Sequence, residues 1–588
     1  MEDQANQNRR LVLAAGLCLL VLMLWPVLFP RPKVAVTPPD SDPVATASAA
    51  RPNAIIAGTA TVTGVATAKV DPTFFEFAGS VSVDSRQVPY NVKLSNVGGG
   101  IETFFLPSYK ERDRDNRATE DPIALANPVV SRLLAGELSA DGFANAESRA
   151  AYGQMSSLRF LEGTTFNLPP LPVYEVVEAQ GDKVRYRYRS PEGLEIEREY
   201  QFKKDSFEIE LAVTVRNGTK QPHSHRLELG GALEATDAMV GGGGFLASFV
   251  PPPDHLKGLC DTDGNVKRPS FQELVKESET FKEAVRWAAI DRQYFVAAFV
   301  ARDGAQAPGE CRLEAKEKVA RAGVVSDLVS LGPGEERRHR YTAYFGVKKQ
   351  SLLTSVDAGL EGAVDYTILG LNLAPLCTAL LWILGMIHRA TGSWGVAILG
   401  LTFLVKVMLF PVNQRAGKAS RAMAVLKPEL DKIKEKFPED RQRQSEEMMK
   451  LYRDHGVNPA GGCLPTLLQM PIWFALYRSL WVSVDLYQEG FLWIADLTTR
   501  DPYWILPVAL VVVMFLQQKM MPTAMDPAQA KIMLYTMPLM FGAMMMALPA
   551  GLCFYILVNT LLTIVQQHFI NRSIGPPKGP PVVQGATA

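Results

Sequence analysis

The sequence predicts a multi-pass α-helical membrane protein, with an N-terminal anchor helix and a five-helix core, that carries a large all-β domain outside the membrane. Long apolar runs occur at residues 11–29 and recur from 395 to 570. Between 72 and 345 apolar and polar residues alternate with a period of two, which is typical of strands with one buried face. The 588 residues therefore combine two chemically different parts.

The composition excludes several classes of protein. The chain has 61 basic and 61 acidic residues, so no positive surplus is available to neutralise a nucleic acid. Six cysteines are too few for a disulfide scaffold, and no Cys/His cluster predicts a metal site. HExxH, GxSxG and Walker sequences do not occur, and no cofactor is expected. Cys260 and Cys311 lie in the polar region, and the sequence leaves their pairing open.

The N-terminal run has two interpretations. Residues 1–10 form a short polar tail, predicted to be cytoplasmic, that ends in Arg9 and Arg10, and 11–29 are apolar. A cleaved signal peptide is the alternative, but its apolar region usually has about 7–15 residues, whereas a bilayer crossing needs roughly 20. We predict an uncleaved signal anchor, followed by a flexible linker at 30–71 that is rich in Pro, Ala, Thr and Val.

The segment 72–345 is predicted to be an antiparallel β-sandwich. Val184, Tyr186 and Tyr188 alternate with arginines, and similar alternation continues through 194–215 with turns between the strands.

The C-terminal part contains five predicted spans. We assign TM2 to 395–412, a cytoplasmic helical hairpin to 413–460, TM3 to 461–482, an outer loop to 483–502, TM4 to 503–519, a cytoplasmic loop to 520–531, TM5 to 532–548, TM6 to 551–570 and a cytoplasmic tail to 571–588.

An earlier apolar stretch, 367–387, decides the topology. If it crossed the membrane, every later loop would change sides. The segment 413–460 carries 11 Lys/Arg against 8 Asp/Glu, whereas 485–503 carries one Arg and four acids. The positive-inside rule then places 413–460 in the cytoplasm, which requires that 367–387 does not cross. We therefore predict that 346–394 is an interfacial region with an amphipathic helix, and that the β-domain is external.

Polar side chains inside the spans are the candidate site. Lys406 stands in TM2, where an ionisable residue costs roughly 2.5–3.5 kcal/mol at the centre of the bilayer. One alternative is a lysine that snorkels to the head groups. The polar faces could pack dry through interhelical hydrogen bonds, or they could line a wet, cationic groove. The predicted groove residues are Lys406, Thr402, Gln414, Gln469, Tyr477, Tyr555, Asn559 and Thr563.

Two further surfaces are candidates for partner binding. Nine of the 20 methionines lie between 520 and 546, and flexible thioethers suit the binding of varied apolar sequences, although ordinary packing is the alternative. The predicted apolar slide comprises Met470, Trp473, Met537, Met540 and Met544. Apolar residues with heptad spacing predict a cytoplasmic hairpin that could serve as a docking arm. Its residues are Leu426, Leu430, Ile433, Phe437, Met448 and Tyr452.

Six stretches of the C-terminal part are distinctive. They are LTFLVKVMLFPV (401–412), LKPELDKIKEKF (426–437), EMMKLYRDHGVNPAGGCLPTLLQMPIWFALYRSL (447–480), DPYWILPV (501–508), DPAQAKIMLYTMP (526–538) and LPAGLCFYILVNTLLTIVQQ (548–567). In this order they resemble the YidC/Oxa/Alb family of membrane-protein insertases. The external domain, with WAAIDRQYFVAAFV at 287–300, is similar to the Gram-negative type, which implies a β-supersandwich in the periplasm.

The resemblance implies a function and partners. It implies an inner-membrane insertase and chaperone, not an enzyme, with both termini in the cytoplasm and a positively charged groove open to cytoplasm and lipid. The groove's positive residue is usually Arg in this family, and here it is Lys406. The implied partners are nascent membrane proteins, the Sec translocon (SecYEG and SecDF), the ribosome and signal-recognition targeting machinery, and lipid, with no nucleic acid beyond ribosome contact.

Two other functions are alternatives to membrane-protein insertion. A secondary transporter would show an inverted repeat with broken helices, and the spans show no internal repeat. The second alternative is an enzyme whose external domain acts on a sugar, since supersandwich folds also occur in sugar-modifying proteins. A fold alone, however, supplies no active site.

Overall fold

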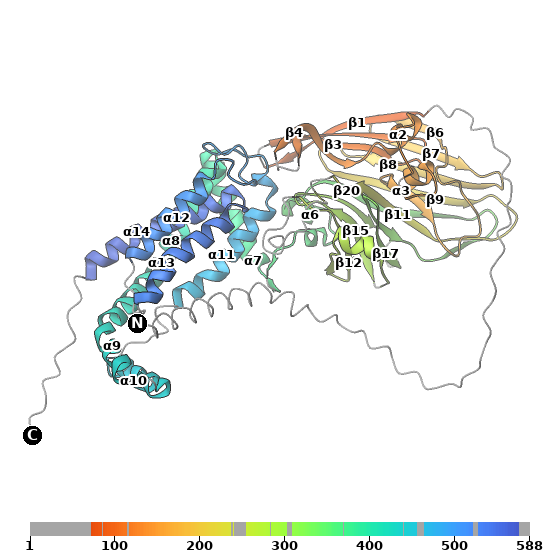
Figure 1. Ribbon diagram of the computed structural model, residues 1–588. Helices are drawn as coiled ribbons and strands as arrows, with labels where there is room; N and C mark the ends of the chain where they lie inside the picture. The colour runs from red at the N-terminus through yellow and green to blue at the C-terminus, as the bar shows by residue number, and fades with distance from the viewer. Residues whose placement is uncertain are drawn as a thin grey trace, which may run out of the picture. The chain divides into compact units, whose positions relative to one another are not determined.

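The computed structural model describes residues 72–574 except 85, 114–116, 141, 237–238, 240–253, 283, 303–308, 369, 439, 456–463 and 521–526 (Figure 1). The predicted anchor at 11–29, the linker and most of the C-terminal tail lie outside these residues. The chain divides into two compact units, and one of them, Pro72–Met525 with Met533–Ala588, holds the β-domain and almost all of the described helices.

The β-domain consists of three main antiparallel sheets. A four-stranded sheet has the order β1-β2-β3-β4, with β1 at Phe74–Val83, β2 at Arg86–Ser95, β3 at Ile101–Arg112 and β4 at Ala118–Ala126. A nine-stranded sheet has the order β13-β12-β15-β16-β20-β9-β8-β7-β6, with β6 at Glu175–Gln180, β7 at Lys183–Arg189, β8 at Leu194–Phe202, β9 at Glu208–Asn217, β12 at Lys257–Thr262, β13 at Asn265–Lys267, β15 at Val285–Asp291, β16 at Phe295–Ala301 and β20 at Glu336–Val347. A five-stranded sheet has the order β14-β17-β18-β11-β5, with β5 at Ser157–Phe160, β11 at Leu227–Glu234, β14 at Glu279–Phe281, β17 at Glu310–Lys316 and β18 at Val319–Val325.

Short elements complete the domain and the segment after it. Two small pairs are β10 (His223–His225) with β19 (Val329–Leu331), and β21 (Thr367–Ile368) with β22 (Leu371–Asn372). The short helices are α2 (Val129–Leu134), α3 (Ala146–Gly153), α5 (Phe271–Lys276), α6 (Gln350–Ser355) and η2 (Leu360–Ala363).

The two smaller sheets cover the same face of the nine-stranded sheet. Phe299 and Phe345 of that sheet contact each other, with ring centroids 5.7 Å apart. Phe345 packs on Phe104 of the four-stranded sheet, and Phe299 lies against Gly231 of the five-stranded sheet. The core therefore lies between one large sheet and two smaller ones, which confirms the all-β class predicted from the period-two pattern.

A buried histidine pair makes the stability of this domain depend on pH. The Nε2 atoms of His225 and His339 are 3.0 Å apart, and both side chains are buried. Burial, with a smaller contribution from His339, lowers the pKa of His225 to about 3. An unfolded histidine titrates near pH 6.5, so between these values the unfolded chain binds a proton that the folded domain excludes.

We expect the free energy of unfolding of the β-domain to fall as the pH drops from 6.5 towards 3, with His225 contributing up to about 1.4 kcal/mol per pH unit. The His225→Phe variant should lose that share of the slope, because phenylalanine does not titrate. Urea unfolding of the detergent-solubilised chain at pH 7 and pH 4.5 measures the difference. Equal pH dependence in the two chains would contradict the assignment.

The C-terminal part is helical (Figure 1). Its helices are α7 (Ala374–Thr391), α8 (Trp394–Val425), α9 (Lys427–Lys436), α10 (Arg441–Asp454), α11 (Leu464–Val482), η4 (Val484–Leu486), α12 (Ile505–Met520), α13 (Pro527–Met545) and α14 (Ala550–Ile574). Among the described residues, three helices are long and apolar enough to cross a membrane, namely Ala374–Thr391, Trp394–Pro411 and Ala550–Phe569. Ile505–Met520 and Ala530–Met545 are shorter apolar helices.

Helix α8 does not end where the predicted span ends. It continues through Pro411 to Val425, so the first part of the segment 413–460 extends α8, and the two arms of the hairpin are α9 and α10. The apolar run marks where hydrocarbon can surround a helix, whereas the helix itself continues while its residues have good helix propensity. The membrane edge at 412 therefore stays a prediction.

Helix α7 packs against both α8 and α11. Its buried residues Cys377, Leu380 and Leu384 form one stripe, and Trp382 on another face is exposed. The Cys377 thiol contacts the carbonyl oxygen of Ala475 in α11 at 3.4 Å. By length and composition α7 could cross a membrane, so its interfacial placement rests on the loop charges and stays a prediction.

Candidate functional site

Helix α8 has one buried and one exposed face. Leu401, Thr402, Val405, Lys406 and Leu409 are buried, at the three-and-four spacing of a single helical stripe. The intervening large apolar residues are exposed, with Phe403 at 61% and Val407 at 57%. An exposed apolar face is what a helix presents to lipid, so Lys406 lies on the side that packs against other helices.

Lys406 contacts α14 directly. Its Nζ donates a hydrogen bond of 2.8 Å to Oγ1 of Thr563, and the residue is 8% exposed. Helices α8 and α11–α14 contain no aspartate or glutamate, so none of them supplies a carboxylate for this ammonium. An ammonium has three donors, and the contact with Thr563 uses one of them.

Two more predicted residues of α14 lie on the same side as Thr563. The Thr563 hydroxyl donates to the carbonyl oxygen of Asn559 at 2.7 Å, which turns its lone pairs towards Lys406. Tyr555, one turn earlier, is buried, and Asn559 is half-buried. The predicted stripe at 555, 559 and 563 is therefore an inward face.

For the remaining predicted groove residues the structure shows no direct hydrogen bond to Lys406 among the described side chains. Thr402 is 1% exposed and donates to the carbonyl oxygen of Ile398 in its own helix at 2.6 Å. Gln414 is half-buried. Tyr477 stacks on Trp473 and Trp481, at centroid distances of 6.3 and 6.0 Å. Helix α11 packs on α8 and α14, but the side chain of its Gln469 lies outside the described residues.

The predicted apolar slide lies partly on the surface. Met470, Met537 and Met540 are exposed, whereas Trp473 and Met544 are partly buried against the helical core. Two contacts show that helix α13 packs on α12. Gly542 lies so close to Val511 that a larger side chain there would collide with it, and the rings of Phe515 and Tyr535 are in contact. The exposed thioethers belong to a surface that lipid or another polypeptide could cover.

Helices α9 and α10 pack against each other, as the hairpin prediction requires. Leu426 and Leu430 are buried, and the other four predicted residues, Ile433, Phe437, Met448 and Tyr452, are half-buried. Asp440 caps α10 by accepting from the backbone N–H of Arg443 at 3.0 Å.

The sequence did not predict how the outer loop meets the β-domain. Asp496 accepts a 2.6 Å ion-pair contact from Arg112 of β3, and Thr498 contacts the same guanidinium at 2.5 Å. Arg112 also lies over the ring of Tyr487, 4.1 Å from its centroid. In the sequence Asp496 is one of the four acids that place the loop at 485–503 outside the membrane. No local pattern identifies its partner, which is 384 residues away.

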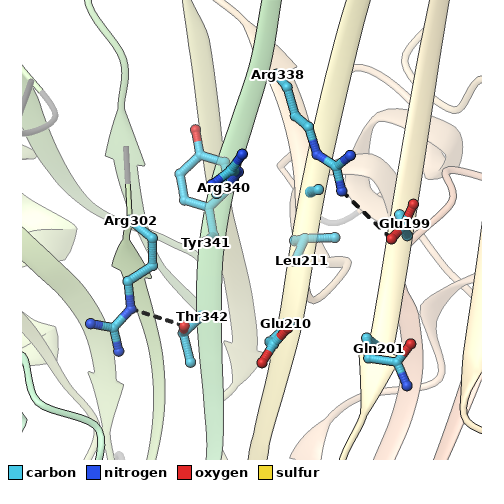
Figure 2. A pocket seen from close by; sticks show the side chains of 10 residues that line it. Glu199, Gln201, Glu210, Leu211, Arg302, Arg338, Arg340, Tyr341 and Thr342 are labelled. Carbon is cyan, nitrogen blue, oxygen red and sulfur yellow. Dashed lines mark hydrogen bonds and ion pairs between the residues drawn. The ribbon is translucent and has the colours of Figure 1, made fainter. Parts of the chain in front are cut away.

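A depression of about 270 Å³ lies on the other face of the nine-stranded sheet, away from the core (Figure 2). Arginines and glutamates line it, and Arg338 pairs with Glu199 at 3.6 Å while Arg302 donates to Thr342 at 3.0 Å (Figure 2). No group of three His, Cys, Asp or Glu side chains that could hold a metal occurs in the described part of the chain. The depression is a charged sheet surface whose side chains bind one another.

Together the structure defines an integral membrane protein with a cationic seam between two helices and a large extramembrane β-domain. Comparison with known families agrees: residues 386–576 match the 60Kd inner membrane protein family, and residues 81–379 match the YidC periplasmic domain. The chain belongs to the YidC family of membrane protein insertases. It is therefore an inner-membrane protein whose β-domain is periplasmic, and its family supports a role in membrane-protein insertion.

Individual relatives extend the match to nearly the whole chain. The membrane protein insertase YidC of Anaeromyxobacter dehalogenans is 33% identical over 96% of this chain and 97% of its own length. That of Citrifermentans bemidjiense is 31% identical over 96% and 99%. A solved structure of an active YidC insertase covers 84% of this chain and 95% of its own, with 18% identity and a TM-score of 0.34.

Proposed function

We propose that this chain inserts membrane proteins by drawing the acidic outer tail of a substrate to Lys406 at the α8–α14 seam. The observation that carries the proposal is the pairing of the Lys406 ammonium with a neutral hydroxyl, that of Thr563. A neutral partner holds the cation more weakly than a carboxylate would. An incoming carboxylate can therefore replace Thr563 and gain a charge-assisted hydrogen bond.

The proposed pathway lowers the barrier that hydrocarbon imposes on a polar tail. A charge that enters the bilayer without a partner is expensive, and Lys406 shortens the uncompensated part of the path. The substrate's apolar segment then moves into lipid along Met470, Met537 and Met540, which are exposed. Burial of the apolar segment supplies the driving force, together with about 2.3 kcal/mol per acidic charge per 100 mV of membrane potential.

No covalent step enters this mechanism, so the proposal is an insertase and chaperone rather than an enzyme. We further propose that it works both alone and beside SecYEG and SecDF, and that α9 and α10 dock the ribosome or the targeting machinery. The exposed, charged surface of this hairpin supports a docking role. Both termini are proposed to lie in the cytoplasm.

Site-specific crosslinking to a stalled nascent membrane protein tests the seam as the path. Thr402 and Phe403 are neighbours on opposite faces of α8, with 1% and 61% exposure. A photo-crosslinker at Thr402 should capture the nascent chain, because the substrate must open the seam, and Tyr555 should behave likewise. Capture at Phe403 alone would show that the substrate passes through lipid outside the protein, and the proposed path would be wrong.

A further inference from the structure

Two cysteines of the periplasmic domain face each other across the sandwich. Cys260 lies on β12 of the nine-stranded sheet, and Cys311 lies on β17 of the five-stranded sheet. Both side chains are fully buried, with 0% exposure. Residues of β12 and β17 approach within 8 Å of each other, measured between Cα atoms.

A contact two residues from each cysteine shows which faces of β12 and β17 meet. A Cβ placed on Gly258 would lie 3.1 Å from Leu313, so Gly258 of β12 faces Leu313 of β17. Side chains two residues apart on a strand share a face. Cys260 therefore points to the same side as Gly258, and Cys311 to the same side as Leu313, so both thiols lie in the layer between β12 and β17. Burial, together with the neighbouring Cys260 thiol, raises the pKa of Cys311, as expected for two thiols that lie close together.

The redox conditions of the surrounding compartment decide whether two neighbouring cysteines stay as thiols or form a disulfide. The family match places both cysteines in the periplasmic domain. The bacterial periplasm is oxidising, and disulfides form and persist there. We propose that Cys260 and Cys311 form an inter-sheet disulfide in the mature protein. This inference is independent of the proposed role of Lys406.

Formation of this disulfide requires an oxidant, which by chemical class is a periplasmic dithiol–disulfide oxidoreductase. The two thiols lose two protons and two electrons, an S–S bond forms between their Sγ atoms, and the oxidant's disulfide is reduced to a dithiol. Burial raises the pKa of the Cys311 thiol, so little thiolate is present in the folded domain. Oxidation therefore occurs while the domain folds, before β12 and β17 enclose the pair.

Peptide mapping of the full chain tests the pairing without any substitution. Cells that express the protein are precipitated in acid to stop thiol exchange, and the chain is then denatured and alkylated with N-ethylmaleimide. We expect a peptide pair joined through Cys260 and Cys311, lighter by two hydrogen atoms than the reduced peptides. Cys377 and Cys553, which lie in helices of the membrane part, should carry the alkyl group and serve as internal controls. A sample reduced before alkylation identifies all the peptides.

Alkylation of both Cys260 and Cys311 in the unreduced sample would overturn the proposal, as would a link from either one to another cysteine. A second readout is thermal unfolding of the β-domain within the full chain. Reduction should lower its midpoint by roughly 5–10 °C, since the bond closes a long loop in the unfolded chain. A Cys260→Ala chain should have the lower midpoint with or without reductant. An unchanged midpoint on reduction of the wild-type chain would also contradict the bond.

Discussion

The Lys406→Ala chain should insert substrates with acidic outer tails at least about tenfold more slowly than the wild type. The tail's charge loses a partner inside the bilayer, and raising the insertion barrier by about 1.4 kcal/mol already slows insertion about tenfold. Proteoliposomes that contain only the purified chain measure the rate directly, through protease protection of the translocated tail.

Three matched changes separate charge from other effects of this substitution. Lys406→Arg keeps the charge and should retain most of the activity. Lys406→Gln keeps hydrogen bonding without charge and should resemble Lys406→Ala. A substrate with the same apolar segment and a neutral tail should insert at similar rates in all four chains. Normal insertion of acidic tails by the alanine variant would refute the role of the charge.

The Glu228→Gln chain should lose about 3–5 kcal/mol of stability in the β-domain. Glu228 of β11 pairs with Arg321 of β18 at 2.9 Å, and both side chains are 1% exposed. Arg321 also donates to Ser157 at 2.6 Å. Neutralising Glu228 leaves the guanidinium buried without a full counter-charge, which costs more than the pair itself contributes.

Hydrogen exchange in the full chain measures this loss, because amides of β11 and β18 should exchange roughly 100-fold faster or more. Glu195→Gln is the control, since Glu195 pairs with Arg189 at 2.9 Å on the exposed sheet surface and should cost less than about 1 kcal/mol. Similar exchange rates in the two variants would show that the buried pair does not hold the sheet together.

Periodicity predicted the classes of structure well and the contacts poorly. The alternation at 194–202 gives β8 its buried residues, such as Ile196 and Tyr200, because a strand turns successive side chains to opposite faces. The same parity places Arg198 in the core, where it donates to the carbonyl oxygen of Gly98 at 2.8 Å. No pattern indicates that acceptor, because it lies in the loop between β2 and β3, 100 residues away in the sequence.

In the candidate site, too, the sequence predicts which residues share a face but not which distant residues they contact. Thr402 and Lys406 share a face because they are four residues apart on one helix, and this is visible in the sequence. The contact of Lys406 with Thr563 joins residues 157 positions apart and depends on how α8 packs on α14. The ion pair between Arg112 and Asp496 likewise depends on tertiary packing, so the sequence revealed the charge of the outer loop but not its partner.

A double-mutant cycle between Lys406 and one aspartate in a substrate tail tests the central claim most directly. Four insertion rates are needed, for wild type and Lys406→Ala, each with the aspartate present or replaced by asparagine. If the ammonium attracts the carboxylate, the cycle should give a coupling free energy of about 1–2 kcal/mol in the insertion barrier. Effects that simply add, with no coupling, would mean that Lys406 never meets the charge, and the proposed mechanism would be wrong.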